Sequence, residues 1–96
     1  MEANKIIITG GATRIGAAIA EKLSGPGKEI VIHFNKSRTK AEKLKKKLSK
    51  NKTKVFLVKG DLSKEIDVNK IVKFAKTKLK YFDCLINNAS LFENDK

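Results

Sequence analysis

Cysteine, proline and aromatic residues are scarce in this chain of 96 residues, which has one cysteine, one proline, one tyrosine and no tryptophan. The single cysteine, Cys84, excludes an internal disulfide and is typical of a reducing compartment. No apolar run approaches the roughly 18 residues that span a bilayer, which excludes a membrane helix. A strand-like run already begins at Ile6, which leaves no room for a secretory signal. We therefore expect a cytoplasmic protein without membrane contact.

Acidic residues are also few, and the formal net charge is +12. Residues 36–54 carry ten basic side chains against one acid, Glu42, a balance that is typical of nucleic-acid binding. No aromatic residue interleaves with these cations, which argues against a base-stacking platform. Ala41, Leu44 and Leu48 recur at helical spacing, so the lysines are expected to form the solvated face of an amphipathic helix. We expect only weak, non-specific attraction to nucleic acid.

Strand-like apolar runs alternate with helical stripes along the chain. Strands are expected at 5–9, 29–34, 54–59 and around 84–86, and helices at about 14–24, 37–50 and from residue 63 onward. Ser37 and Ser63 are the expected N-caps of the last two helices. The predicted core stripes are Ile15, Ala18, Ile19 and Leu23 in the first helix and Val68, Ile71, Val72, Ala75 and Leu79 in the third.

The βαβαβαβ order predicts an α/β fold of the Rossmann-like, doubly wound parallel type. Right-handed crossovers give the strand order 3-2-1-4, and apolar strands of this kind are buried on both faces. Folds of this type usually continue beyond a fourth strand. Residues 1–96 are therefore expected to form the N-terminal portion of a single nucleotide-binding domain.

The sequence TGGATRIG, residues 9–16, lies between the first strand and the first helix. Unpaired backbone N–H groups and the positive end of the helix dipole meet at such a place and favour a pyrophosphate. Gly10 permits the tight turn, and Gly16 lets the helix pack closely on the sheet. These glycines could merely form a turn, but the strand before them and the helix after them favour dinucleotide binding. Arg14 stands where the usual fingerprint has its middle glycine.

Three motifs together resemble those of the short-chain dehydrogenases/reductases. Residues 9–16 resemble the family's T-G-x-x-x-x-[IL]-G loop, residues 60–62 resemble the segment with its adenine-contacting Asp, and residues 87–90 resemble its N-N-A-G motif. The resemblance covers nearly the whole chain and implies an oxidoreductase with a nicotinamide cofactor. The cofactor-binding residues that it implies are Gly10, Thr13, Arg14, Ile15, Gly16, Asp61, Leu62, Asn88, Ala89 and Ser90.

Two departures from the family pattern are similar to the pteridine reductases, which have an arginine in the loop and N-N-A-S after the fourth strand. Here these residues are Arg14 and Ser90. In that subgroup an aromatic residue two positions beyond the serine stacks on the pterin. Phe92 has this position, although it could equally be a loop aromatic that covers the sheet edge. The resemblance implies that Arg14, Ser90 and Phe92 bind a pteridine-like substrate, with Arg14 as a charge-assisted donor.

The end of the second strand predicts which nicotinamide cofactor is bound. An NAD site has an acid about 20 residues beyond the loop, but residues 33–38, HFNKSR, contain none. Lysine, serine and arginine (Lys36, Ser37 and Arg38) at a helix N-terminus suit a 2′-phosphate, so we expect NADP(H). The segment also resembles the H-x-x-R-S segment of pteridine reductases, with lysine in place of the arginine. The predicted contacts are His33, Asn35, Lys36 and Ser37, although His33 could be a simple strand-end residue.

The family's proton donor, a tyrosine four residues before a lysine, is missing. Position 85, four residues after Tyr81, is a leucine, so we expect no catalytic residue in this chain and no turnover by it alone. We also expect no metal site.

Three hypotheses about the function remain. The chain could be the cofactor-binding half of a pteridine-reductase-like enzyme. It could be a catalytically dead interaction module that docks on a full-length homologue through the open edge of its fourth strand. Pairing as a homo-oligomer or with a C-terminal half is the other expected association. It could be a basic nucleic-acid-binding domain, supported by net charge alone.

Overall fold

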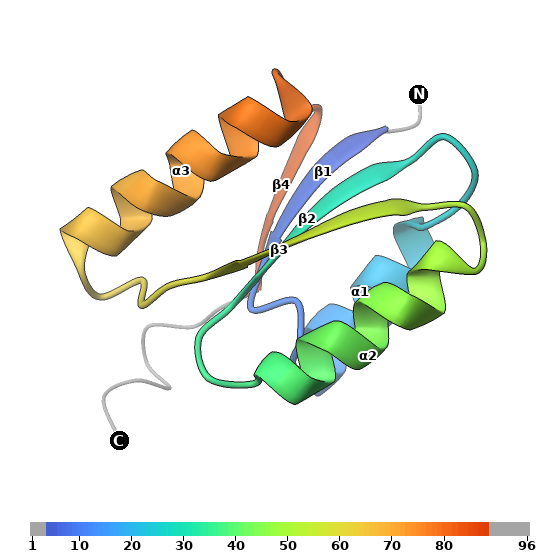
Figure 1. Ribbon diagram of the computed structural model, residues 1–96, viewed down its shortest axis with the longest axis horizontal. Helices are drawn as coiled ribbons and strands as arrows, with labels where there is room; N and C mark the ends of the chain where they lie inside the picture. The colour runs from blue at the N-terminus through green and yellow to red at the C-terminus, as the bar shows by residue number, and fades with distance from the viewer. Residues whose placement is uncertain (1–3, 89–96) are drawn as a thin grey trace.

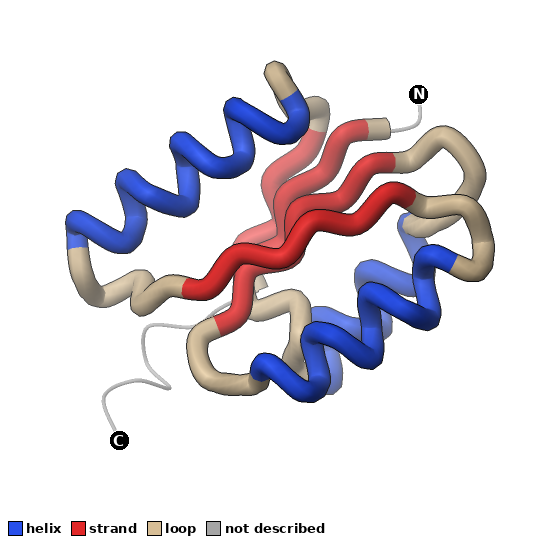
Figure 2. Tube along the Cα trace, viewed as in Figure 1, coloured by secondary structure: helices blue, strands red, loops and turns tan. Residues whose placement is uncertain are grey.

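A computed structural model describes residues 4–88 as a four-stranded parallel sheet with helices on both faces (Figure 1). The elements are β1 (Lys5–Thr9), α1 (Arg14–Leu23), β2 (Glu29–Phe34), α2 (Arg38–Ser49), β3 (Lys54–Lys59), α3 (Glu65–Leu79) and β4 (Cys84–Asn87). The strand order is β3-β2-β1-β4, and α1 and α2 cover one face while α3 covers the other (Figure 2). The predicted Rossmann-like α/β fold and strand order are confirmed.

Alternate residues of the strands enter two separate core layers, which is why these strands are apolar throughout. The layer under α1 and α2 contains Ile6, Ile8, Ala20, Ile30, Ile32, Leu44, Leu48 and Val55. The layer under α3 contains Ile7, Val31, Val58, Ile71, Ala75 and Leu79. The predicted outer face of the lysine-rich helix is confirmed, because Ala41, Leu44 and Leu48 are its buried residues.

The predicted core face of α1 is partly wrong. Ile15 is 66% exposed and Ala18 is also exposed, whereas Gly16 and Ala20 are buried. A Cβ at Gly16 would collide with the backbone of the preceding loop, so only glycine permits this close contact. The contact through these small residues turns Ile15 toward solvent.

The predictions for α3 also need two corrections. Val72 is 45% exposed and lines an open apolar pocket together with Ile7 of β1 and Leu85 of β4. Ser63 is not the N-cap, since α3 begins at Glu65 and its N-cap is Lys64. The Ser63 hydroxyl instead donates to Asp61 Oδ1 at 2.7 Å. Ser37 is the N-cap of α2 by position but makes no side-chain cap bond.

The parallel register brings the carboxyl ends of the strands to one edge of the sheet. Thr9 at the end of β1 is paired with Asn87 of β4, and Phe34 of β2 is paired with Lys59 of β3. The loops that follow these strands therefore lie next to one another. Every described residue that the sequence assigned to a site comes from these loops or from the strand and helix ends that flank them.

Candidate functional site

The loop after β1 is held in one shape by residues from two other strand ends. Gly10 has a φ of 64°, in the left-handed region that favours glycine. Its carbonyl accepts from the hydroxyl of Thr13 at 2.8 Å and from Asn88 Nδ2 at 3.0 Å. Its N–H donates to Nδ1 of His33 at 3.0 Å. The structure thus brings together four of the predicted site residues, Gly10, Thr13, His33 and Asn88.

Thr13 is the N-cap of α1, and its hydroxyl is fully used. The oxygen accepts from the N–H of Gly16 at 3.1 Å and from Asn88 Nδ2 at 2.9 Å, while its proton goes to the Gly10 carbonyl. A cap of this kind fixes where the helix begins and which of its N–H groups remain open.

The next two residues of α1 present those open groups. In the part of the chain that the structure describes, the backbone N–H groups of Arg14 and Ile15 have no hydrogen-bond partner. Both residues are exposed, and the first turn of the helix contains no acid. Two unpaired N–H groups, a helix N-terminus and the cationic side chain of Arg14 form a local setting that favours an anion.

His33 lies behind the loop and not on its open side. Only 2% of the residue is exposed. Because the Gly10 N–H donates to Nδ1, that nitrogen is unprotonated, and Nε2 carries the proton toward the Gly60 carbonyl 2.8 Å away. Burial lowers the pKa of His33 from its ordinary value of 6.5, against the raising effects of Gly60 and Asp61. Both ring nitrogens are taken, so the ring has none left for a phosphate.

The end of β2 presents the basic segment that the sequence singled out. Lys36 is exposed and Ser37 half-buried at the start of α2. Glu42, the first acid along the sequence after this segment, is engaged by Arg38, whose Nη1 lies 3.7 Å from the Glu42 carboxylate. The Arg38 guanidinium also lies over the ring of Phe34, 5.1 Å from its centre. Arg38 is therefore already partnered, whereas Lys36 extends into solvent.

Asp61 and Asn35 line one shallow pocket at the ends of β2 and β3. The pocket has a volume of about 360 Å³ and is lined by Asn35, Lys59, Gly60, Asp61, Lys64, Asp67 and Lys70. Hydrogen bonds from the hydroxyl and the N–H of Ser63 lower the pKa of Asp61, so this carboxylate is ionised at neutral pH. Its own N–H donates to Asp67 Oδ2 at 2.8 Å. Sequence reasoning missed the lysines here, although Lys59 could have been found from its place at a strand end.

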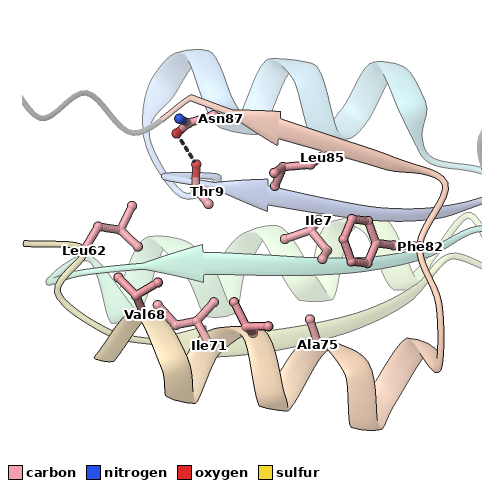
Figure 3. Close-up of a pocket in the computed structure, with 10 residues that line it drawn as sticks. Ile7, Thr9, Leu62, Val68, Ile71, Ala75, Phe82, Leu85 and Asn87 are labelled. Atoms are coloured by element: carbon pink, nitrogen blue, oxygen red, sulfur yellow. Dashed lines mark hydrogen bonds between the residues drawn. The ribbon is translucent and has the colours of Figure 1, made fainter. Parts of the chain in front are cut away.

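An apolar groove lies on the α3 side of the sheet, beside β1 and β4 (Figure 3). Its volume is about 240 Å³, and it is lined by Ile7, Thr9, Leu62, Val68, Ile71, Val72, Ala75, Phe82, Leu85 and Asn87. Thr9 and Asn87 close the end next to the loop, where the Thr9 hydroxyl donates to Asn87 Oδ1 at 2.9 Å. Leu62, predicted as a cofactor contact, has its side chain in this groove. No sequence motif indicates this groove, because its residues come from five separate segments.

Three of the predicted site residues fall outside the part of the chain that the structure describes. Ala89, Ser90 and Phe92 lie outside the described residues, so Arg14 is the only predicted substrate contact that the structure places. Tyr81 is exposed at the opposite edge of the sheet, with Lys5 Nζ 4.6 Å from its ring centre. Across residues 4–88 there is no group of side chains that could hold a metal ion and no helix long and apolar enough to cross a membrane.

The amino-acid sequence of this chain is similar to those of known proteins. A family model described as short chain dehydrogenase matches residues 4–96. The short-chain dehydrogenase/reductase homolog YusS of Bacillus subtilis is 32% identical over 89 residues, which cover 92% of this chain and 82% of YusS. That relative is thus only a little longer than this chain. Other curated relatives are much longer, and the chain spans 38% and 32% of two of them.

Solved structures are also similar. A short-chain dehydrogenase from Oenococcus oeni is 29% identical with a TM-score of 0.80, covering 98% of this chain and 48% of its own. The FolM alternative dihydrofolate reductase 1 from Brucella canis, in complex with NADP, is 36% identical with a TM-score of 0.78. This match covers 91% of the present chain and 35% of FolM.

Proposed function

Because the chain belongs to the short-chain dehydrogenase family, we propose that residues 1–96 are the N-terminal, NADP(H)-binding portion of a single Rossmann domain. The completed domain transfers a hydride between NADP(H) and a pteridine-like substrate. The observation that carries this proposal is the capped loop of β1 and α1, whose open N–H groups face solvent beside Arg14. The single unpaired Cys84 supports a cytoplasmic location.

The open start of α1 suits the cofactor's diphosphate. The N–H groups of Arg14 and Ile15 donate to its oxygens, and the helix dipole adds to the attraction. Thr13 and Asn88 are already bonded to the loop, so they set its shape and leave the diphosphate to the helix N-terminus. The Arg14 side chain, on the open side of the loop, supplies a cation to either the diphosphate or the substrate.

The cofactor's adenosine end suits the two neighbouring strand ends. Lys36 and Ser37 donate to a 2′-phosphate, and Glu42 is engaged by Arg38 and does not oppose it. The pocket that contains Asn35 and Asp61 lies next to them. The ionised Asp61 carboxylate accepts a hydrogen bond from the amino group of an adenine. NADP is the cofactor in the FolM complex, the structural relative with 36% identity, which supports the same choice here.

The pteridine assignment rests on Arg14, Ser90 and Phe92, together with the similarity to a dihydrofolate reductase. Steady turnover also needs a proton donor that these 96 residues lack. We propose that a C-terminal half with the Tyr-x-x-x-Lys pair docks on the open edge of β4 and in the apolar groove, where Leu85 is 56% exposed. A second copy is disfavoured, since two chains of charge +12 repel each other.

Cofactor selectivity tests the binding half of the proposal. Hydrogen bonds to a charged group contribute roughly 1.5–3 kcal/mol each. Solvent at this exposed rim weakens them, so we expect the full chain to prefer NADPH over NADH by about 2 kcal/mol, or roughly thirtyfold. Lys36→Asp should remove most of this preference. Lys43→Asp makes the same charge change on the exposed face of α2 and should retain it. Equal affinities in the parent, or equal losses in both variants, would refute the assignment.

Co-expression tests the catalytic half of the proposal. The chain alone should not oxidise NADPH in the presence of a dihydropteridine. Co-expressed with the C-terminal half of FolM, it should form a complex that does so. Leu85→Asp places a charge in the groove and should abolish complex formation, whereas Ile66→Asp, an exposed site on α3 outside the groove, should not. A complex that forms equally well with Leu85→Asp would exclude the groove as the docking site.

A further inference from the structure

The one histidine of the chain joins the ends of three strands. His33 belongs to β2, its Nδ1 accepts from the N–H of Gly10 after β1, and its Nε2 donates to the carbonyl of Gly60 after β3. The residue is almost fully buried. A buried polar side chain with both nitrogens bonded to backbone fixes the relative position of the segments that it joins.

Residue 33 also holds both glycines that open the loop. Its side chain accepts from the Gly10 N–H, and its main-chain carbonyl accepts from the Gly11 N–H at 3.0 Å. The Gly11 N–H and the Gly10 carbonyl belong to one peptide group, and this carbonyl accepts from Thr13 and Asn88. The start of α1, with its open N–H groups, is therefore aligned from behind by His33.

The charged surroundings of the ring are limited. The loop after β1 presents backbone groups to it, and the charged group that acts on it from the end of β3 is Asp61. On α3, Asp67 is bonded to the N–H of Asp61. The Asp61 carboxylate favours the protonated ring, but burial has the larger effect and keeps the ring neutral.

We propose that His33 is a positioning residue whose neutral ring is required for the binding shape of the cofactor loop. This proposal rests on the proposed NADP(H) function. Protonation of Nδ1 would place an N–H group against the N–H of Gly10 and break that bond, while the bond from Nε2 to Gly60 would persist. Loss of the Gly10 bond releases the Thr9–Gly10 peptide, which leads directly into the Gly10 carbonyl that accepts from Thr13 and Asn88.

The sign of the pH dependence follows from the lowered pKa of His33. The unfolded chain binds a proton near the ordinary value of 6.5, so the free energy of unfolding begins to fall below that pH. Cofactor affinity falls only at a pH below 6.5, where His33 begins to bind a proton in the folded chain without cofactor. One proton gives a loss of at most about tenfold in affinity per pH unit.

Nuclear magnetic resonance of the full chain without cofactor tests the hydrogen bond directly. Because the chain has a single histidine, ¹⁵N-labelled histidine reports one ring. We expect Nδ1 to be unprotonated at neutral pH, with a scalar coupling across the hydrogen bond to the Gly10 amide nitrogen. This coupling should vanish as the ring protonates, and the Gly10 amide signal should follow the same titration. A protonated Nδ1 at neutral pH, or a Gly10 amide signal that does not change as the His33 ring titrates, would overturn the proposal.

Two variants then connect the ring to cofactor affinity. In His33→Asn the side-chain oxygen takes the place of Nδ1 and does not titrate, whereas His33→Gln offers a donor toward Gly60 and no matched acceptor for Gly10. We expect the Asn variant to bind NADPH at pH 7.5 within about threefold of the parent and the Gln variant to bind at least tenfold more weakly. The ratio of parent to Asn-variant affinity should fall once the pH drops through the lowered pKa of His33 in the folded chain, and titration of the ligand's own phosphate cancels in this ratio.

The outcomes separate the two proposals. A ratio that is constant with pH, or a Gln variant that binds as well as the Asn variant, would show that the ring does not position the loop. If no chain binds cofactor at any pH, the proposed function fails, and the resonance measurement alone decides whether His33 holds Gly10. If either variant fails to fold, the resonance measurement on the parent chain decides whether the His33 ring holds Gly10.

Discussion

Replacement of Asn88 by alanine should loosen the junction between β4 and the loop of β1. The Asn88 amide makes two hydrogen bonds, to the Gly10 carbonyl at 3.0 Å and to the Thr13 hydroxyl at 2.9 Å. These residues lie 78 and 75 positions away in the sequence, so the bonds tie the end of the described chain to its beginning. The variant removes both bonds and leaves the backbone of β4 intact.

The size of the effect depends on which hydrogen bonds Gly10 and Thr13 retain in the variant. The Gly10 carbonyl still accepts from the N–H and the hydroxyl of Thr13, and that hydroxyl still accepts from Gly16. No buried group is left unpaired, so each lost bond costs only the net value of about 0.5–1.5 kcal/mol. We expect a loss of about 1–2 kcal/mol in the free energy of unfolding. At about 4–8 °C per kcal/mol for a domain of this size, Tm should fall by roughly 4–16 °C.

Urea and thermal denaturation followed by circular dichroism measure this loss. Asn69→Ala provides the matched control, because Asn69 is exposed on α3 and makes no hydrogen bond to a side chain in the described residues. The control should change the free energy of unfolding by less than about 0.5 kcal/mol, as surface substitutions usually do. If Asn88→Ala is as stable as this control, the two bonds contribute nothing and β4 is held by its strand pairing alone.

Three further predictions follow from other parts of the molecule. Gly16→Ala forces a Cβ against the loop backbone and should cost about 1–3 kcal/mol of stability, measured by urea denaturation; a neutral result would contradict the close packing of α1. Hydrogen bonds from the backbone N–H groups of Asn4 and Lys5 lower the pKa of Asp83 in the folded chain. Its contribution to the free energy of unfolding is therefore fully present above the ordinary pKa of 3.8 and is lost as pH falls through the lower pKa of the folded chain. Asp83→Asn should flatten this acidic part of the stability curve, and an unchanged curve would show that Asp83 is not responsible. Binding to DNA or RNA should be independent of sequence and fall steeply with salt; a site that survives high salt would favour a nucleic-acid function.

The strands and their order could be predicted because burial on both faces demands continuous β-branched runs, such as Ile6 to Ile8. The face of α1 was misjudged because hydrophobic periodicity gives Gly16 little weight, although the closest contact with the loop lies there. The N-cap at Ser63 was misjudged because Asp61 competes for the same hydroxyl. The role of His33 could not be predicted from the neighbouring sequence, since its hydrogen-bond partners, Gly10 and Gly60, follow two other strands.

The place of β1 in the middle of the sheet has a consequence for the order of folding. β1 precedes the other described strands in the chain, yet one of its two neighbours is β4, the last strand within residues 4–88, and the pairing of Ile6 with Cys84 closes a long loop of chain. Non-local pairing of this kind is slow, so β1, β2 and β3 should assemble before β4 docks. Among the strands of the described residues, β4 is the shortest and pairs on one side only, which gives it the lowest barrier to local opening. Asn88 follows this strand directly. The loop between β1 and α1 is therefore completed only at the final step of folding, and it is the first part of the sheet edge to be released when the strand detaches.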